Sequence, residues 1–298
     1  MLLERTNPVH WEWLVYLEMF VAGIAAGMVM VAALLELGGR GRSPLARTAH
    51  AVALPLVALC GLLLAVDLSR PDRFWHMVIQ SETLRPMFKY WSAMSLGSQL
   101  LLLFGGVTFV SFVDFLISRG LFRLGGWRDT RTLHGSALGR VWAVLALLLG
   151  FAIASYSGVL LETTNMPGWG HSSLIGAVYV TTAIITGAAT LVLIQALRGR
   201  ADAEVMALAQ TNGWLIVWWL LLIVLFLATL GEGVRFILAG TATVALIGAV
   251  LLGGVIPLAL RFLTRMRTAS ALTLSATLVL VGGFLLRYAI VMGPQSVH

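Results

Sequence analysis

The sequence predicts an all-α integral membrane protein with eight transmembrane helices. Of its 298 residues, 59% are hydrophobic and only 11% are charged, and the mean hydropathy is +0.93. A soluble domain carries about 25% charged residues, so too few polar side chains are present to cover a surface in water. The apolar residues are also gathered in runs of about 20, the length of helix that crosses a hydrocarbon core of about 30 Å.

Eight such runs follow one another along the chain. The first lacks a cationic start and exceeds the apolar core of a signal peptide, so we expect it to be retained as a helix. Gly253, Gly254 and Pro257 interrupt the seventh run, and its separation from the sixth depends on the short segment 231–235. Seven or nine spans are therefore the alternatives to eight. The predicted spans are 14–37, 49–66, 91–117, 138–161, 172–197, 214–230, 236–260 and 271–292.

The basic residues orient these helices. Lysines and arginines favour cytoplasmic loops, and thirteen of the 20 lie in the loops that follow spans one, three, five and seven. Both termini are therefore expected outside. The net charge of +7 belongs to loop anchors, so nucleic acid is not a predicted partner. The remaining seven basic residues are Arg5, Arg70, Arg73, Arg85, Lys89, Arg235 and Arg287.

Cysteine and histidine usage limits the cofactors. The single cysteine, Cys60, cannot form an internal disulfide or hold an iron–sulfur cluster alone. A b-type haem needs axial histidines on facing helices, whereas none of the six histidines lies well inside a predicted span. We expect no haem and no iron–sulfur cluster in this chain.

Polar residues within the spans are the candidates for function, because a charged group at the bilayer centre costs about 2.5–3.5 kcal/mol. Most of them fall in the outer half, which predicts a site that opens to one side of the membrane. The inner half offers groups near the cytoplasmic helix ends and Gln99 in the third span. The outer candidates are Glu18, Asp67, Tyr156, Ser157 and Arg287, and the inner ones are Glu36, Gln99, Asp114 and Gln195.

Each candidate also has a structural interpretation. Asp67 and Arg70 are spaced to close a helix end as an i,i+3 pair, and Glu18 could form a buried ion pair with Arg287. The spacing of Gly23 and Gly27 is typical of close helix packing. Trp214, Trp218 and Trp219 are predicted to face lipid or the membrane interface.

Three stretches of the chain form a recognisable pattern. The first is the aromatic segment 10–13 followed by Gly23 to Gly27. The second is the segment 67–76, Asp-Leu-Ser-Arg-Pro-Asp-Arg-Phe-Trp-His, with 93–97 behind it. The third is the end of the fourth span, 156–161, followed by Pro167, Gly168 and Trp169. Together they resemble the NrfD family, which includes the membrane subunit of polysulfide reductase, although the chain has Ser69 where glycine is usual and Ser157 where threonine is common.

The resemblance implies two four-helix bundles, residues 1–165 and 166–298, with a quinone or quinol pocket near the external face of the first. Menaquinone and ubiquinone are both possible ligands. The implied partners are membrane lipid, an external ferredoxin-like subunit with several iron–sulfur clusters, and a molybdopterin catalytic subunit. The chain would sit in a prokaryotic cytoplasmic (inner) membrane, as a multi-pass subunit that is not catalytic alone.

The resemblance also assigns residues to this site. The family's aspartate and tyrosine carry over to Asp67 and Tyr156. Glu18 takes the variable polar position of the first helix and His10 lies further out, so two candidates remain for contact with the quinone. Reduction of a quinone takes up two electrons and two protons, for which the site needs hydrogen-bond partners and a proton path. Arg70, Ser157 and Trp169 complete the predicted binding set.

These observations favour a membrane anchor of a respiratory oxidoreductase that exchanges electrons and protons between the quinone pool and an iron–sulfur subunit. The alternative is a proton- or ion-translocating subunit of a respiratory complex, with Glu36, Gln99, Asp114 and Gln195 along its cytoplasmic half. A passive transporter or purely structural anchor is the third hypothesis.

Overall fold

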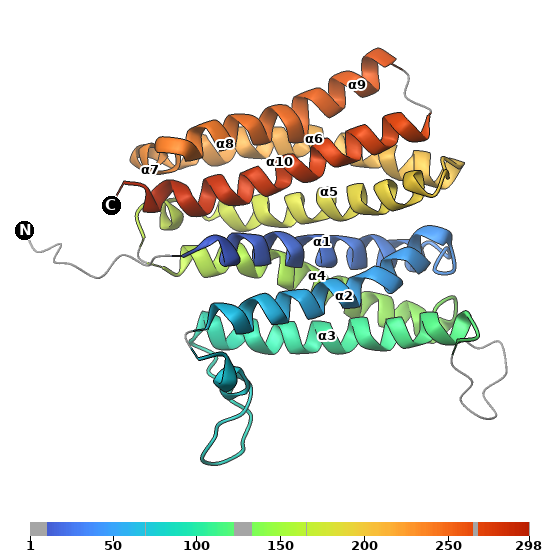
Figure 1. Cartoon of the computed structure of the whole chain (residues 1–298), viewed down its shortest axis with the longest axis horizontal. Coiled ribbons are helices and arrows are strands. Elements are labelled where there is room, and N and C mark those ends of the chain that lie inside the picture. The colour runs from blue at the N-terminus through green and yellow to red at the C-terminus, as the bar shows by residue number, and fades with distance from the viewer. Residues whose placement is uncertain (1–10, 69, 122–132, 165, 265–267, 298) are drawn as a thin grey trace, which may run out of the picture.

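The chain forms a bundle of long, roughly parallel and antiparallel helices, with no β-strand among the residues that the structure describes (Figure 1). This structure is a computed structural model, and it describes residues 11–68, 70–121, 133–164, 166–264 and 268–297. The first helix begins and the last helix ends at the same end of the bundle (Figure 1), as an even number of crossings requires, and there the Trp11 amide donates to Gln295 Oε1 at 2.7 Å. Side chains are described in all of these ranges except at 262–264.

All eight predicted spans are present as helices long and apolar enough to cross a membrane. This confirms an all-helical membrane protein with eight candidate spans in the described residues, rather than seven or nine. Seven spans are single helices, and the remaining one is assembled from shorter pieces. The seven are α1 (Trp13–Leu37), α2 (Pro44–Asp67), α3 (Ala93–Ser118), α4 (Ala137–Glu162), α5 (Leu174–Leu197), α6 (Ala203–Thr229) and α10 (Ala269–Gln295).

Two of these helices begin earlier than their apolar runs. α2 starts at Pro44 rather than at residue 49, because Ser43 accepts a hydrogen bond from the Ala46 amide and proline suits the first helical position. α6 starts at Ala203 rather than at residue 214, because the Asp202 carboxylate caps the helix by accepting a hydrogen bond from the Val205 amide. A hydropathy pattern misses such polar first turns, although they are helical.

The seventh span is bent. A short helix α7 (Val234–Ile237) precedes α8 (Gly240–Val250), which continues through a π-helical turn, η4 (Leu251–Val255), into α9 (Ile256–Thr264). Pro257 has no amide to donate to the carbonyl four residues earlier, so the regular ladder breaks near Gly253. The glycines and the proline that interrupt the apolar run therefore mark a bend within one span.

Helices α1 and α5 form the centre of the molecule. They bury most of the residues in their apolar stretches, whereas the other six spans bury fewer than half. α1 packs against α2, α4, α5 and α10. At the contact with α5, a Cβ atom on Gly27 would collide with the Ala183 carbonyl, and one on Gly187 would collide with the backbone of Gly27. The close packing predicted from Gly23 and Gly27 is confirmed, and α5 is the partner.

Large apolar side chains cover the outer surface of the bundle, as expected for contact with lipid. Trp214 and Trp218 are exposed there, as predicted. Trp219 is different: it is buried, and its indole Nε1 donates to the Thr182 hydroxyl at 2.8 Å. The prediction that all three tryptophans face outward was wrong for Trp219, because adjacent residues on a helix are about 100° apart.

Candidate functional site

Glu18, Asp67 and Tyr156 come together at the end of the bundle that carries the start of α1. Glu18 lies five residues into α1, Tyr156 lies six residues before the end of α4, and Asp67 is the last residue of α2. At a rise of about 1.5 Å per residue, these positions lie within about 10 Å of the same ends. The Glu18 carboxylate interacts electrostatically with both Asp67 and Tyr156. We call Glu18, Asp67 and Tyr156 the carboxylate–phenol cluster.

The phenol of Tyr156 is positioned by a glycine on the neighbouring helix. A Cβ atom on Gly97, in the second turn of α3, would collide with Cζ and Oη of Tyr156. The aromatic ring therefore occupies space that any other residue at position 97 would fill. Gly97 belongs to the segment 93–97 that carried the resemblance, and its role is to admit this ring.

Ser157, the neighbour of Tyr156, is buried where α4 meets α5. One residue further, a Cβ atom on Gly158 would stand 2.8 Å from the Gly176 amide nitrogen, so the two backbones are in contact. Ser157 thus lies beside the cluster in sequence, on the side of α4 that packs into the protein.

Asp67 and Arg70 are both exposed at the end of α2. Within the described residues Asp67 forms no ion pair with Arg70, whereas Arg73 pairs with its neighbour Asp72 at 3.9 Å. The interpretation of Asp67 and Arg70 as a pair that closes the helix is therefore not supported. Asp67 remains open to the surface above Glu18.

Between α2 and α3 the chain forms a folded loop, described over residues 70–92, with a short 3-10 helix, η1 (Pro71–Met77). Polar side chains of α3 hold it in place: the Ser95 hydroxyl donates to the Met87 carbonyl at 3.1 Å and Gln99 Nε2 donates to it at 3.2 Å. Ser98 donates to the Met77 carbonyl at 3.2 Å. Gln99 therefore lies at the same end as the carboxylate–phenol cluster, and its assignment to the inner half was wrong.

Arg287 lies deeper, fully buried between α10, α5 and α1. Its Nη2 donates to the Tyr179 carbonyl at 3.1 Å, and the guanidinium carbon stands 3.6 Å from the centre of the Tyr179 ring. Glu18 interacts with Arg287 electrostatically, but the two form no ion pair within 4.0 Å among the described residues. The direct pair proposed from the sequence is absent, and α5 supplies the partner of Arg287.

Trp169 and His10 are the remaining predicted binding residues. Trp169, in the short 3-10 helix η2 (Trp169–His171), is fully buried, donates through Nε1 to the Ile290 carbonyl at 2.7 Å and stacks on Trp11 with ring centres 5.0 Å apart. It packs against α10 and the entry to α1 rather than against the carboxylate–phenol cluster. His10 and Ser69 lie outside the described residues.

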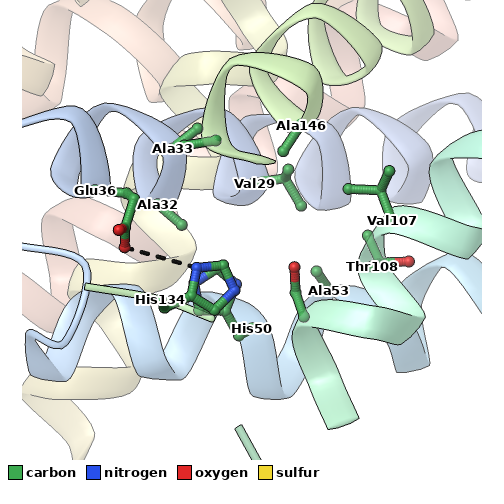
Figure 2. A pocket seen from close by; sticks show the side chains of 12 residues that line it. Val29, Ala32, Ala33, Glu36, His50, Ala53, Val107, Thr108, His134 and Ala146 are labelled. Carbon is green, nitrogen blue, oxygen red and sulfur yellow. Dashed lines mark ion pairs between the residues drawn. The ribbon is translucent and has the colours of Figure 1, made fainter. Parts of the chain in front are cut away.

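A second polar cluster lies at the opposite end of the first four spans. Glu36 is near the end of α1, and its Oε2 stands 3.6 Å from Nδ1 of His134 (Figure 2). The His134 ring stacks on His50 of α2 with centres 3.9 Å apart. All three side chains are buried around a cavity of about 10 Å³, room for about one water molecule. We call Glu36, His50 and His134 the histidine cluster.

The backbone around His134 is held by further charged groups. Asp114 accepts hydrogen bonds from the amides of Leu133 and His134 at 2.6 and 3.3 Å, and Arg42 donates to the His134 carbonyl at 3.0 Å. His134 lies outside the membrane-spanning segments, and burial lowers its pKa, although Asp114 and Glu36 act in the opposite direction. Sequence reasoning found Glu36 and Asp114 but missed both histidines, because they meet only through the packing of α1, α2 and the chain before α4.

In the described part of the chain, no three of His, Cys, Asp and Glu are placed to hold a metal ion. Gln195, the last of the inner candidates, donates to the Thr48 hydroxyl at 2.8 Å and to the Pro44 carbonyl at 3.2 Å. It therefore connects α5 to the first turns of α2.

The fold and the carboxylate–phenol cluster define a multi-pass helical membrane protein with protonatable groups gathered at one end. Comparison with known proteins identifies its family. The chain belongs to the NrfD family, since the family model described as "Polysulphide reductase, NrfD" matches residues 1–297.

Curated relatives agree with this family. The chain is 26% identical to Protein NrfD of Escherichia coli K12 over 216 residues, which cover 67% of this chain and 65% of the relative. It is 28% identical to a polysulfide reductase chain of Wolinella succinogenes over 166 residues, 54% of this chain and 50% of the relative. A putative dimethyl sulfoxide reductase membrane subunit of Halobacterium salinarum is 26% identical over 213 residues, 68% of this chain and 47% of the relative. The chain thus spans about half to two thirds of these relatives.

Proposed function

We propose that the chain is the membrane subunit of a respiratory oxidoreductase and exchanges electrons and protons between the quinone pool and an external iron–sulfur subunit. The observation that carries the proposal is the convergence of Glu18, Asp67 and Tyr156 at one end of the first four spans. Two of the relatives are named as parts of polysulfide or dimethyl sulfoxide reductase, which supports a role within such a complex.

The cluster has the groups that quinol chemistry requires. When bound, a quinone or quinol would supply the two-electron, two-proton couple. Tyr156 can donate or accept a hydrogen bond at a ring oxygen, and Glu18 can hold the proton within the membrane. Asp67, exposed at the end of α2, can pass that proton to water. Arg70 and Ser157 flank this path, and the ring would lie among the apolar residues of the helices.

The finer arrangement belongs to the same proposal. We place both termini outside the cytoplasmic membrane of a prokaryote, following the excess of arginines in the alternate loops. Residues 1–165 would form a first four-helix bundle that holds the menaquinone or ubiquinone site, and residues 166–298 a second. The folded loop 70–92 contacts α2, the helix that ends at Asp67, and offers a surface for a ferredoxin-like subunit, with a molybdopterin catalytic subunit beyond it.

The test is binding of a quinone-analogue inhibitor to the purified complex. The double variant Tyr156→Phe with Asp67→Asn removes a phenol and a carboxylate without adding bulk. We expect inhibitor affinity to fall about tenfold or more, since hydrogen bonds to charged groups contribute about 1.5–3 kcal/mol. Glu18→Gln should leave binding in place and slow turnover, because the proton holder is lost.

Matched controls separate the site from general damage. Tyr288→Phe changes a tyrosine whose hydroxyl bonds Thr241 in the other half of the chain, and Asp72→Asn changes an exposed carboxylate in the same loop. Both should bind inhibitor as the wild type does. Unchanged binding in the Tyr156 and Asp67 double variant would refute this site.

The histidine cluster supports a second candidate function, proton or ion translocation. Glu36, His50 and His134 are buried titratable groups around a space for one water molecule, and buried ionisable groups near a membrane are functional candidates by default. We leave Gln99 and Gln195 out of this path, because both side chains have structural partners. Gln99 donates to the Met87 carbonyl and holds the loop, and Gln195 donates to the Thr48 hydroxyl and connects α5 to α2. Turnover in vesicles without potential-dependent proton uptake would remove this candidate.

A further inference from the structure

A large cavity lies in the other half of the molecule, remote from both polar clusters. Its volume is about 1040 Å³, and α5, α6, α9 and α10 line it. Most of the lining is small or apolar, with Ala189, Ala209, Ala276 and Val279 as examples. The volume matches a site for a sizeable organic molecule, for which about 300–1000 Å³ is typical.

The bend of the seventh span creates this space. Gly253 and Gly282 are in backbone contact, since a Cβ atom on Gly282 would collide with Gly253, so η4 and α10 touch at this level. Beyond Pro257, α9 rises away from α10 at the end of the bundle opposite the chain termini (Figure 1). The cavity, which we call the wedge, lies between α6, α9 and α10 towards this end, the end we place in the cytoplasm.

Two polar side chains, those of Arg261 and Asn212, line the wedge. A Cβ atom on Gly213 would collide with Nη1 of Arg261, so the guanidinium lies directly against α6, where Nη1 donates to the Gln210 carbonyl at 2.7 Å. Asn212 is 6% exposed, and its Nδ2 donates to the Ile185 carbonyl at 3.3 Å. Its Oδ1 is buried and has no hydrogen-bond partner among the described residues.

We propose that this wedge binds one anionic diacyl phospholipid of the phosphatidylglycerol type. The phosphodiester lies beside Arg261, a headgroup hydroxyl donates to Asn212 Oδ1, and the acyl chains fill the apolar part of the wedge. Asn212 lies nine residues into α6, about 13 Å from its first residue. This is a depth that a headgroup reaches when it is drawn in between helices.

Charge and hydrogen bonding favour this occupant over a neutral lipid or a quinol. Arg261 lines this partly apolar space, and its guanidinium forms stronger, charge-assisted hydrogen bonds with a phosphodiester than with a neutral ring. Basic pockets between helices on the cytoplasmic side are typical sites for acidic lipid headgroups. The unpaired Asn212 oxygen needs a donor, which a headgroup hydroxyl supplies and a choline headgroup does not.

Lipid titration of the purified protein, followed by native mass spectrometry, tests this without any variant. The probes are phosphatidylglycerol, phosphatidylethanol and phosphatidylcholine with identical acyl chains. Phosphatidylethanol keeps the phosphodiester charge but lacks the headgroup hydroxyls. We expect one retained phosphatidylglycerol, bound about tenfold more tightly than phosphatidylcholine and about threefold more tightly than phosphatidylethanol.

Variants locate the bound lipid. Arg261→Gln should abolish the preference for the two anionic lipids, and Asn212→Leu should abolish only the preference for phosphatidylglycerol over phosphatidylethanol. Arg200→Gln, which removes an exposed charge near the same helix ends, should bind all three lipids as the wild type does. Equal affinity of the wild type for the three lipids, displacement of the lipid by a quinone, or equal effects of Arg200→Gln and Arg261→Gln would each overturn the proposal.

Discussion

The ring of Tyr156 lies against Gly97, so closely that a methyl group at position 97 would collide with the phenol oxygen. Gly97 contributes no functional group, yet it decides where the hydroxyl of Tyr156 stands. The contact joins the second turn of α3 to the last turns of α4 and keeps the phenol near Glu18. A substitution at Gly97 can therefore displace the phenol without removing it.

Gly97→Ala is expected to lower quinol-dependent turnover of the complex about tenfold or more, because a displacement of about 1 Å at a reacting group can cost about a hundredfold in rate. Gly106→Ala, on the same helix, is the control, since a Cβ atom there meets nothing within 4 Å. The measurement is steady-state turnover with a soluble quinol analogue, alongside the yield of assembled complex. Equal turnover in the two variants would contradict a positioning role for Gly97.

The contact between α1 and α5 predicts a stability effect. Gly187→Ala places a methyl group into the backbone of Gly27, and overpacking of this kind costs about 1–3 kcal/mol. Gly176→Ala, also on α5, is expected to be nearly neutral because the nearest atom that its new methyl group would meet, the Ser155 carbonyl oxygen, stands 4.0 Å away. Unfolding in mixed micelles compares the two, and a smaller loss for Gly187→Ala than for Gly176→Ala would count against close packing of these helices.

Arg287 and Tyr179 predict a second stability effect. Tyr179→Leu removes the ring beneath the guanidinium and is expected to lower the free energy of unfolding by about 2 kcal/mol, the strength of a buried cation–π contact. Tyr179→Phe keeps the ring and removes a hydroxyl that has no hydrogen-bond partner among the described residues, so no loss is expected. If both variants lost the same stability, the ring would not be the group that holds Arg287.

Acid should destabilise the histidine cluster. Because burial lowers the pKa of His134, the unfolded chain binds a proton more readily than the folded one. The stabilising contribution is present above the unfolded pKa of about 6.5 and is lost as pH falls from there towards the lowered folded value. Thermal unfolding between pH 8 and 5 should show this loss, and it should be smaller in His134→Gln. The same pH profile in both proteins would show that His134 is not responsible.

Some features of this protein follow from local chemistry and were predictable. Eight apolar runs of membrane-spanning length give eight helices, because in a hydrocarbon core every backbone polar group must be satisfied within its own segment. The small residues Gly23 and Gly27 likewise predicted a close helix contact. Glu18, Asp67 and Tyr156 could be grouped because successive spans alternate in direction, so the start of the first span and the ends of the second and fourth lie on the same side of the membrane.

Other features depend on which helix faces which, and helix packing decided them. Trp218 and Trp219 are adjacent residues of the same type at nearly the same depth, but only Trp219 points inward and contacts Thr182. Gln99 holds a loop, Trp169 packs against α10, and Arg287 rests on Tyr179 rather than on Glu18. A run of apolar residues carries little information about rotation, because lipid and the protein interior are similarly apolar and only close packing and hydrogen bonds distinguish them.

The sequence by itself thus determined the membrane class, the span count and the ends at which polar groups gather. The tertiary structure alone decided that His50 and His134 stack beside Glu36, and that Arg261 and Asn212 line one cavity. The physical reason is the range of the interactions. Hydropathy and capping act within a segment, whereas these sites are made by residues 84 and 49 positions apart, respectively, and only the packing of separate helices brings such residues to one place.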